Sequence, residues 1–597
     1  MKPTDTTEPE YFHKVVDCQY GCPAHTPVPE YIRLIAAGRY TDAYMVNWES
    51  NVFPGVLGRT CDRPCEPVCR RGRVDEEPVA ICRLKRVAAD NKDDVAHLIP
   101  KAPLSRNGKR IALIGGGPAS LTVARDLAPL GYDIDLYDDQ PLGGGFMRSQ
   151  IPVFRLPPEV LNEEVDFILD MGVNQHFNTY VDSLKRILDQ GYDAVFVGTG
   201  APRGSDLDLP GRAECDKYIH VGIDWLGSVA FDHIDKIGKR VLVLGGGNTA
   251  MDCCRTARRI GGDDVKVVVR SEFARMKASP WEIEDAAAED IPIINNHVPK
   301  EFVHEDGVLK GMVFTVVDVL YDDDGTRRLE PTGEEVFFEA DEVLIAIGQD
   351  NAFPWIERDI GIEFGKWDMP VLDQTTFQST LDKVFFGGDA ALGPENIITA
   401  VAQGHEAATS IDLFLNGGDV QARPAPGVTL LSQKMGVHEW SYDSTVSIDD
   451  RFAVPHAAKD AALKDRRVEV ELGFDREVAY QEAERCLNCD IQTVFSPPKC
   501  IECDACVDIC PTDCINFVVN DDEPALRNSL RVPARNTSQD LYVSTTLQQT
   551  GRVMVKDENV CLHCGLCAER CPTGAWDMQQ FLYSVTKAGS PCNQKRP

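Results

Sequence analysis

The sequence predicts a multidomain α/β protein, and three observations support this prediction. The chain has 597 residues, too many for one hydrophobic core and enough for about three to five domains. Its middle alternates short apolar strands, glycine-rich turns and stretches of helical periodicity. Its 21 cysteines gather near the two ends, and only Cys215, Cys253 and Cys254 lie between them.

Charge and hydropathy exclude several classes of partner. The net charge of -33 argues against nucleic acid or an anionic membrane surface, because phosphate binding requires clustered Lys and Arg. The N-terminus has no apolar core of the signal-peptide kind, and no apolar run approaches the roughly 18 residues of a membrane span. We therefore expect a cytoplasmic chain whose cysteines are metal ligands or redox groups rather than disulfides.

A first glycine loop follows a predicted strand over residues 110–114. In a Gly-x-Gly-x-x-Gly loop, the glycines permit a tight turn, approach of a pyrophosphate and close helix packing. Gly115 and Gly117 fit this pattern, and the small Ser120 takes the third place. Asp138 ends the next predicted strand, where an acid binds ribose hydroxyls. An ordinary strand–helix turn is the alternative, but strand, loop and acid together favour nucleotide binding.

A second glycine loop follows a predicted strand over residues 240–244. It contains Gly245, Gly247 and a tolerated alanine in third place. Here Arg270-Ser271-Glu272 replaces the acid after the second strand. Arg270 and Lys277 suit a 2′-phosphate, whereas the adjacent glutamate suits a free 2′-hydroxyl, so NAD and NADP both stay open at this point.

Further strands indicate how the two folds are connected. Apolar stretches ending in glycine turns cover residues 193–200 and 341–348, and residues 384–389 end in an acid suited to ribityl hydroxyls. Each also fits an ordinary buried strand. Their order resembles the two-dinucleotide flavoprotein plan, with a nicotinamide domain inserted into an FAD domain. The expected domains are a helical iron–sulfur domain (1–104), an FAD domain (105–203 and 345–415), an NAD(P) domain (204–344), a linker (416–490) and an α+β ferredoxin-like domain (491–597).

Cysteine spacing near the C-terminus predicts two [4Fe–4S] clusters. The pattern Cys-x-x-Cys-x-x-Cys-x-x-x-Cys-Pro occurs twice, as in bacterial ferredoxins, where the fourth cysteine ligates the other cluster. The predicted ligand sets are Cys500, Cys503, Cys506 and Cys571, and Cys561, Cys564, Cys567 and Cys510. Two structural zinc sites are the alternative. Cys514 and Cys592 fall outside the pattern and are expected to be free thiols.

The order of motifs from Cys18 to Leu415 resembles the small (beta) subunit of glutamate synthase and its relatives, including the N-terminal part of dihydropyrimidine dehydrogenase. The stretches that carry this resemblance are Cys22-Pro23, Gly58-Arg59-Thr60-Cys61, Pro64-Cys65-Glu66-x-x-Cys69, Pro78-Val79-Ala80-Ile81, Gly144-Gly145, Ile151-Pro152-x-Phe154-Arg155-Leu156-Pro157 and Gly247-Asn248-Thr249-Ala250-Met251-Asp252.

The resemblance implies one FAD in the first fold and a nicotinamide dinucleotide in the second. The implied FAD residues are Gly115, Gly117, Asp138, Gly145, Arg155, Gly388 and Asp389. The implied nicotinamide residues are Gly245, Gly247, Asn248, Thr249, Arg270 and Lys277. Family members often have a second arginine where this chain has Ser271, and this departure favours NAD slightly.

The resemblance also implies two [4Fe–4S] clusters in the N-terminal helical domain. The family's Glu-Ala-x-Arg-Cys-x-x-Cys stretch does not precede Cys18 but occurs at residues 482–489. Our hypothesis is that the linker carries this pair back. One set is then Cys18, Cys69, Cys486 and Cys489, and the other is Cys22, Cys61, Cys65 and Cys82. In relatives the fourth ligand of the second set matches Lys85, and Cys82 lies on the same face if that segment is helical. A single N-terminal cluster, or zinc at Cys486 and Cys489, are alternatives.

These expectations define an FAD- and iron–sulfur-dependent NAD(P)H:acceptor oxidoreductase subunit. Hydride passes between nicotinamide and flavin without a protein acid or base, so we expect no catalytic side chain. No further substrate domain is visible, which indicates a partner such as a 2-oxoacid or aldehyde oxidoreductase, or ferredoxin. The small subunit of NADPH-dependent glutamate synthase is the alternative function. A non-catalytic scaffold with structural zinc is the alternative from another class.

Overall fold

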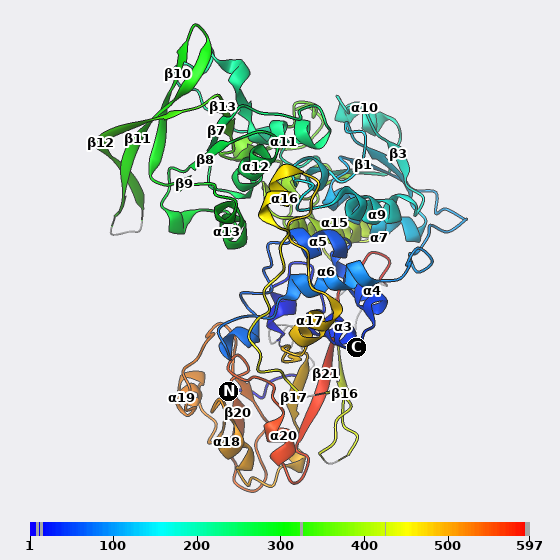
Figure 1. Cartoon of the computed structure of the whole chain (residues 1–597). Helices are drawn as coiled ribbons and strands as arrows, with labels where there is room; N and C mark the ends of the chain where they lie inside the picture. The colour runs from blue at the N-terminus through cyan, green and yellow to red at the C-terminus, as the bar shows by residue number, and fades with distance from the viewer. Residues whose placement is uncertain are drawn as a thin grey trace.

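The computed structural model describes residues 1–6, 11, 16–322, 326–423, 426–436, 438–443 and 445–590. Two sheet-containing folds lie at the top of Figure 1, and a helical module lies in the middle. The C-terminal module, which also contains sheets, lies at the bottom. This arrangement confirms the multidomain α/β class predicted from the sequence.

The first dinucleotide fold is a parallel sheet in the order β15-β4-β1-β2-β3. Its strands are β1 (Arg110–Ile114), β2 (Asp133–Tyr137), β3 (Asn174–His176), β4 (Ala194–Val197) and β15 (Val384–Phe386). Its helices are α7 (Pro118–Leu127), α8 (Phe146–Ser149), α9 (Pro158–Leu169), α10 (Leu184–Asp189), α14 (Asp389–Leu392) and α15 (Ile397–Leu415). Since β15 pairs with β4 from far along the chain, the residues between these strands form an insertion.

The inserted fold is a second parallel sheet in the order β6-β13-β7-β8-β9. Its strands are β6 (Ile219–Val221), β7 (Arg240–Leu244), β8 (Asp264–Val268), β9 (Ile293–Ile294) and β13 (Glu342–Ile345). Its helices are α11 (Gly222–Ala230), α12 (Asn248–Arg259) and α13 (Pro280–Ala288). The short strands β5 (Arg203–Gly204) and β14 (Gln349–Asp350) pair where the chain enters and leaves it.

An antiparallel sheet unpredicted from the sequence extends from the inserted fold. It contains β10 (His297–Glu305), β11 (Val308–Tyr321) and β12 (Arg327–Glu339). Figure 1 shows it beside β8 and β9. Half of its side chains face solvent, so its apolar pattern is weak, and this explains why sequence reasoning did not find it.

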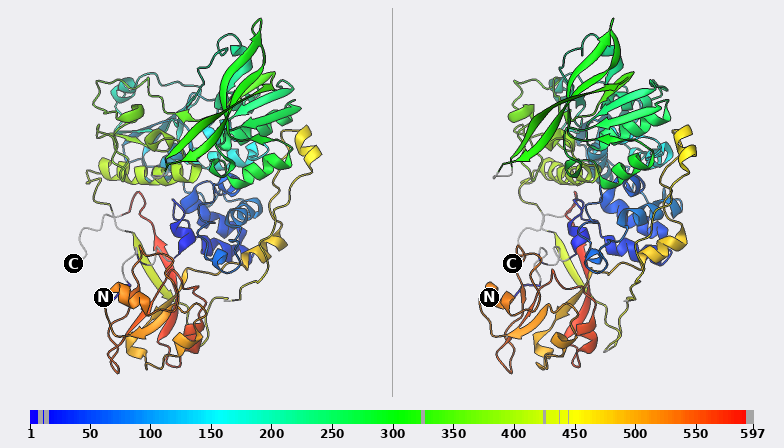
Figure 2. Two further views of the ribbon diagram at one scale, coloured as in Figure 1. Left: turned by 90° about the vertical axis from the view of Figure 1, so that its left-hand side faces the viewer. Right: turned by 60° about the vertical axis from the view of Figure 1, so that its left-hand side comes forward.

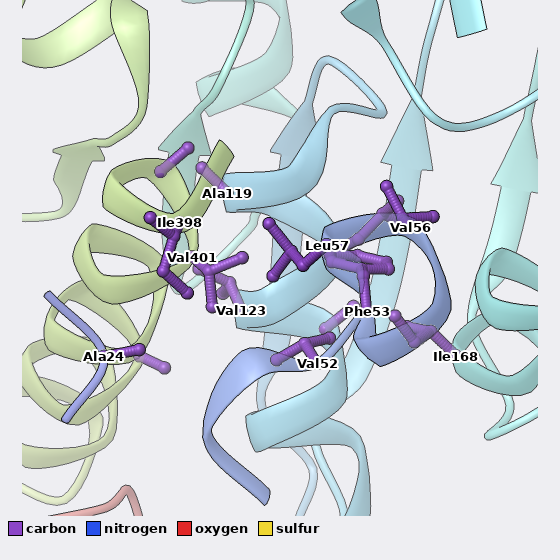
Figure 3. Close-up of a cluster of buried hydrophobic side chains, with 14 of the residues drawn as sticks. Ala24, Val52, Phe53, Val56, Leu57, Ala119, Val123, Ile168, Ile398 and Val401 are labelled. Carbon is purple, nitrogen blue, oxygen red and sulfur yellow. The ribbon is translucent and has the colours of Figure 1, made fainter. Parts of the chain in front are cut away.

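The N-terminal helical module packs on the first fold through apolar side chains. Its helices are α2 (Asp17–Tyr20), α3 (Val28–Ala36), α4 (Tyr40–Asn51), α5 (Pro54–Thr60) and α6 (Ile81–Asn91). In Figure 3, Phe53 and Leu57 lie beside Val123 of α7 and Val401 of α15, and all four are 0% exposed. Hydrophobic burial of this kind fixes the end of α5, where Cys61 follows, against the first fold.

The described residues of the segment expected to be a linker form three regular elements. Helix α16 (Lys459–Lys464) contacts α12, and α17 (Arg476–Ala483) contacts α3 and α6. Strand β16 (Gly427–Ser432) pairs with β21 (Trp576–Ser584) and so belongs to the C-terminal sheet. Figure 2 shows the yellow part of this segment running along the outside of the blue helical module.

The C-terminal module has α+β architecture, as predicted. Its sheets are β16-β21-β17 and β18-β20-β19. Its remaining elements are β17 (Ile491–Phe495), α18 (Ala505–Ile509), β18 (Ile515–Val518), α19 (Glu523–Asn528), β19 (Tyr542–Val543), β20 (Val553–Lys556) and α20 (Leu566–Arg570). Within the described ranges, none of the helices has the length and apolar character needed to cross a bilayer.

Candidate active site

A cleft of about 740 Å³ lies where the two dinucleotide folds meet. Its lining includes many of the residues that the sequence singled out, namely Gly115, Gly117, Asp138, Gly145, Arg155, Asn248, Thr249, Gly388 and Asp389. Thr60 and Asp62, which flank Cys61, also line it. The cleft is therefore walled by both folds and by the helical module.

Two glycines lie where the loops of the first fold come too close together for any side chain. A Cβ added at Gly115, whose φ is +95°, would lie 2.5 Å from the carbonyl oxygen of Gly198. A Cβ added at Gly145, whose φ is +52°, would lie 2.7 Å from the Cα of Gly117. Side chains would both strain the backbone and block the loops. The tight packing leaves the N-terminus of α7 facing the cleft, as a pyrophosphate requires.

The carboxyl groups of the buried Asp138 and the half-buried Asp389 also line the cleft. Asp138 accepts hydrogen bonds from the backbone N–H groups of Gly116 and Gln140. Asp389 accepts one from the N–H of Glu395 over 3.1 Å. Burial raises the pKa of each carboxyl to about 6. The glycine cradle and two hydroxyl acceptors fit the phosphates, ribose and ribityl chain of FAD.

The second glycine loop is also open for a phosphate. A Cβ added at Gly245, whose φ is +138°, would lie 2.1 Å from the carbonyl oxygen of Ala346, so only glycine fits. A Cβ added at Gly247 would meet no described atom within 4 Å. Asn248 begins α12 and accepts a hydrogen bond from the N–H of Ser279 over 2.8 Å. Arg270 and Lys277 are exposed on the loop after β8 and lie outside the cleft lining.

Arg155 joins the two folds electrostatically. Its Nη1 donates to both carboxylate oxygens of Asp252, over 2.7 and 2.8 Å, and its Nη2 lies 2.5 Å from Glu282 Oε1. The guanidinium is thus already paired with two carboxylates of the inserted fold. Its role as an FAD ligand stays a prediction.

The structure brings Cys18, Cys69, Cys486 and Cys489 around one small cavity. Helix α17 packs against α3 and α6 and delivers the last two thiols from the far end of the chain. This is the wrapped-back arrangement that the sequence predicted. Four thiols around one cavity suit a cubane cluster.

A second set in the helical module comprises Cys22, Cys61, Cys65 and Cys82, and Lys85 lies beside all four. Burial by itself would lower the pKa of Lys85, but the charges of these cysteines raise it above its usual value. Lys85 Nζ also donates to Asn51 Oδ1 over 2.8 Å. Cys82 and Lys85 both lie on α6, so this chain has a thiol and a buried cation on the face where relatives have the fourth ligand.

The C-terminal module pairs each cysteine triplet with the fourth cysteine of the other. The charges of Cys503 and Cys571 both act on Cys500, and that of Cys510 acts on Cys564. This exchange matches the predicted ligand sets. Cys503 and Cys564 are exposed, whereas Cys506, Cys561, Cys567 and Cys571 are buried.

Cys514 was expected to be a free thiol outside the pattern. Its Sγ lies 3.6 Å from Cys510 Sγ, and it also interacts with Cys561, so it borders the second C-terminal set. Cys592, for which the same was expected, lies outside the described residues.

Arg70 and His563 connect the helical and C-terminal modules. The side chain of Arg70 is fully buried, pairs with Asp17, and donates from Nη1 to the carbonyl oxygen of Cys561 over 2.5 Å. His563 Nδ1 lies 3.1 Å from the carbonyl oxygen of Cys489. Sequence reasoning missed both residues. The signal that the sequence offered was position alone: Arg70 follows Cys69, and His563 lies within the Cys561 triplet.

The four cysteine sets form an ordered series. Cys61 lies between two residues of the cleft wall. Tyr31 is 0% exposed and donates a hydrogen bond to the carbonyl oxygen of Ile81 over 3.2 Å. Ile81 precedes Cys82 of one set and lines the cavity of the Cys18 set. Cys489 contacts His563, which belongs to the Cys561 triplet. The series therefore leads from the cleft through both modules to the exposed Cys503.

Comparisons with known proteins agree with this organisation. Residues 109–404 match the family model of pyridine nucleotide-disulphide oxidoreductases. Residues 13–96 match dihydropyrimidine dehydrogenase domain II with its 4Fe-4S cluster, and residues 499–575 match the 4Fe-4S dicluster domain.

Three curated proteins are similar over most of their length. The NADP(+)-dependent formate dehydrogenase subunit beta of Moorella thermoacetica is 36% identical, over 79% of this chain and 70% of that protein. The NADPH-Fe(3+) oxidoreductase subunit beta of Geobacter sulfurreducens is 32% identical, over 81% and 77%. The glutamate synthase [NADPH] small chain of Azospirillum brasilense is 32% identical, over 66% and 86%.

Fold and site thus define an oxidoreductase that uses FAD, a nicotinamide dinucleotide and [4Fe–4S] clusters in both its N-terminal and C-terminal regions. The chain belongs to the family that contains the small chain of glutamate synthase and the beta subunit of NADP-dependent formate dehydrogenase. The family resemblance and the cofactors expected from the sequence are confirmed.

Proposed function

We propose that this chain is the NAD(P)H-handling subunit of a larger oxidoreductase and conducts electrons between the cleft and a partner bound near Cys503. The observation that carries this proposal is the order of the cysteine sets, which begins at the cleft wall and ends at an exposed thiol. The flavin, when bound, supplies the exchange between a hydride and single electrons.

The chain's own residues bind and orient the two dinucleotides and shield the cysteine sets from water. The glycine loops admit the two dinucleotides, and Asp138 and Asp389 accept hydroxyl hydrogen bonds. All four cysteines of the Cys22 set are buried, as are Cys18 and Cys489 of the other N-terminal set, so the helical module excludes water from them. We nominate no acid or base for proton transfer, because hydride exchange between nicotinamide and flavin requires none.

Two kinds of partner fit the proposal. Two similar curated proteins are named as beta subunits. These names favour a catalytic partner chain, such as a 2-oxoacid, aldehyde or formate oxidoreductase, and ferredoxin is the other kind of partner. Thiolates held as cluster ligands suit a reducing compartment, and the cytoplasm is our proposed location.

The second candidate function is that of a glutamate synthase small subunit. Similarity to that small chain favours it, but the C-terminal module argues against it, since that relative aligns with only 66% of this chain.

Anaerobic stopped-flow reduction tests the proposal. We expect NADPH or NADH to reduce the flavin first, the N-terminal clusters next and the C-terminal clusters last, followed by absorption and by EPR of frozen samples. A Cys503→Ser variant should still reduce a dye that accepts electrons at the flavin, but should lose transfer to ferredoxin. Reduction of the C-terminal clusters before the N-terminal clusters would contradict the proposed order.

A further inference from the structure

The hairpin of β11 and β12 contacts the loop that follows β8. Tyr321 and Arg327 are cross-strand partners near the end of this hairpin. Tyr321 OH donates to Glu272 Oε1 over 2.6 Å, and Arg327 Nη1 donates to Ser271 Oγ over 2.9 Å. Two neighbouring side chains of the hairpin thus hold two consecutive residues of the loop.

This loop has a defined place in a dinucleotide fold. β7, the second glycine loop and α12 form the first strand–turn–helix unit, and β8 is the second strand. The residues after that second strand meet the 2′ position of the adenosine ribose. Ser271 and Glu272 are therefore at the position that distinguishes a 2′-hydroxyl from a 2′-phosphate.

The charges around the loop favour the phosphate. Arg270 precedes Ser271 in the chain, and Arg327 reaches Ser271 from the hairpin. The acid suited to a free 2′-hydroxyl is Glu272, which already accepts the hydrogen bond of Tyr321 and lies 3.7 Å from Arg275 Nε. Guanidinium groups bind phosphate in a paired geometry, whereas a free 2′-hydroxyl would have to compete for this carboxylate.

We infer that Arg327, together with Arg270, binds the 2′-phosphate of NADP(H), and that Tyr321 disables Glu272 as an acceptor for the 2′-hydroxyl of NAD(H). This inference rests on the proposed function in one respect, the binding of a nicotinamide dinucleotide by the inserted fold. Ser271 carries no charge, and Arg327 brings a cation to it from another strand. The slight preference for NAD drawn from Ser271 alone is thereby reversed.

Binding of 2′,5′-ADP and 5′-AMP to the full chain tests the inference, measured by isothermal titration calorimetry. Neither ligand carries a nicotinamide, so the result does not depend on electron transfer through flavin or clusters. We expect the intact protein to bind 2′,5′-ADP more tightly than 5′-AMP. Arg327→Ala should weaken 2′,5′-ADP binding about tenfold, the usual scale for one charge-assisted hydrogen bond, and leave 5′-AMP binding unchanged.

Arg328→Ala is the matched control. Arg328 is next to Arg327 on β12, so its side chain points to the opposite face of the sheet, and its Nη2 pairs with Glu330 over 2.9 Å. This control should bind both ligands like the intact protein. Tyr321→Phe should improve 5′-AMP binding by releasing Glu272. Equal loss in the Arg327 and Arg328 variants, or tighter binding of 5′-AMP by the intact protein, would overturn the inference.

Discussion

His563 Nδ1 donates a hydrogen bond to the carbonyl oxygen of Cys489 over 3.1 Å, and its backbone N–H donates to Cys561 Sγ over 3.3 Å. One residue therefore contacts a cysteine of the helical module and a cysteine of the C-terminal module. The side chain is buried, and Arg70 Nη1 lies 3.0 Å from its Nε2. The joint between the modules is thus a hydrogen-bonded contact, in addition to the chain that runs from Cys489 into β17.

Replacement of His563 by alanine should slow electron transfer between the N-terminal and C-terminal clusters. Loss of a hydrogen-bonding neighbour of a metal ligand typically costs about 10- to 100-fold in activity, and we expect this range for the reduction rate of the C-terminal clusters. Rapid-freeze EPR after mixing with NADPH measures it. Flavin reduction should keep its rate. The exposed His97 provides the control variant His97→Ala, and equal rates in the two variants would remove His563 from the path.

Cys486→Ser should remove one N-terminal cluster. The thiols of Cys486 and Cys489 complete a site whose other members are more than 400 positions away in sequence, at Cys18 and Cys69. The iron content should fall by one [4Fe–4S] equivalent, and one EPR signal should disappear. Cys215→Ser is the control, since that buried thiol donates to the carbonyl oxygen of Gly211, as a hydroxyl also can. Unchanged iron content in the Cys486 variant would refute the wrapped-back set.

Affinity for FAD should fall as the pH drops below about 6. The folded, FAD-free chain holds the pKa of Asp138 and of Asp389 near 6, because burial raises both. Hydroxyl groups of FAD favour the carboxylate form, so below pH 6 binding must first release protons. The same raised pKa means that these two groups reduce the stability of the FAD-free chain as the pH rises through 6.

Fluorescence of released FAD, measured between pH 5 and 8, checks this expectation. Asp138→Asn should bind FAD more weakly at pH 7 and depend less steeply on pH, because one of the two titrating groups is absent. Asp189→Asn is the control, because Asp189 is exposed and does not line the cleft, and its profile should match the intact protein. A profile for Asp138→Asn with the steepness of the intact protein would mean that this carboxyl does not contact FAD.

Local patterns explain which parts of the fold and site were predictable. β1 and β7 begin and end where the sequence placed them, because an apolar strand before a glycine loop is a short-range signal. The cysteine spacing of the C-terminal module is a short-range signal of the same kind, and the ligand sets drawn from it stay a prediction. The joint through Arg70 depends on how two modules dock, and the contact of Arg327 depends on exposed strands. Neither produces a periodic pattern of apolar residues in the sequence. Arg155 was interpreted from the family alone, and its pairing with Asp252 and Glu282 follows only from the packing of the two folds.

Replacement of Arg155 by alanine should destabilise the junction of the two folds by about 3–5 kcal/mol at pH 7. Removing one member of a buried ionic group leaves the others charged and unpaired, and this is the usual cost. Burial raises the pKa of Asp252 to about 6, and the charge of Arg155 opposes that rise. Without the guanidinium, the carboxyl of Asp252 takes up a proton more readily, so the loss should shrink at pH 5.

Thermal unfolding of the variant at pH 7 and pH 5 checks both the size and the sign of the effect. The triple change Arg155→Ala, Asp252→Asn and Glu282→Gln should recover part of the loss, because no uncompensated charge then remains buried. Arg212→Ala is the control: its partners Asp206 and Asp216 are largely exposed, and surface pairs contribute roughly 0–1 kcal/mol. An equal loss at both pH values would show that Arg155 acts through packing, since only an electrostatic role makes the cost depend on the ionisation of Asp252.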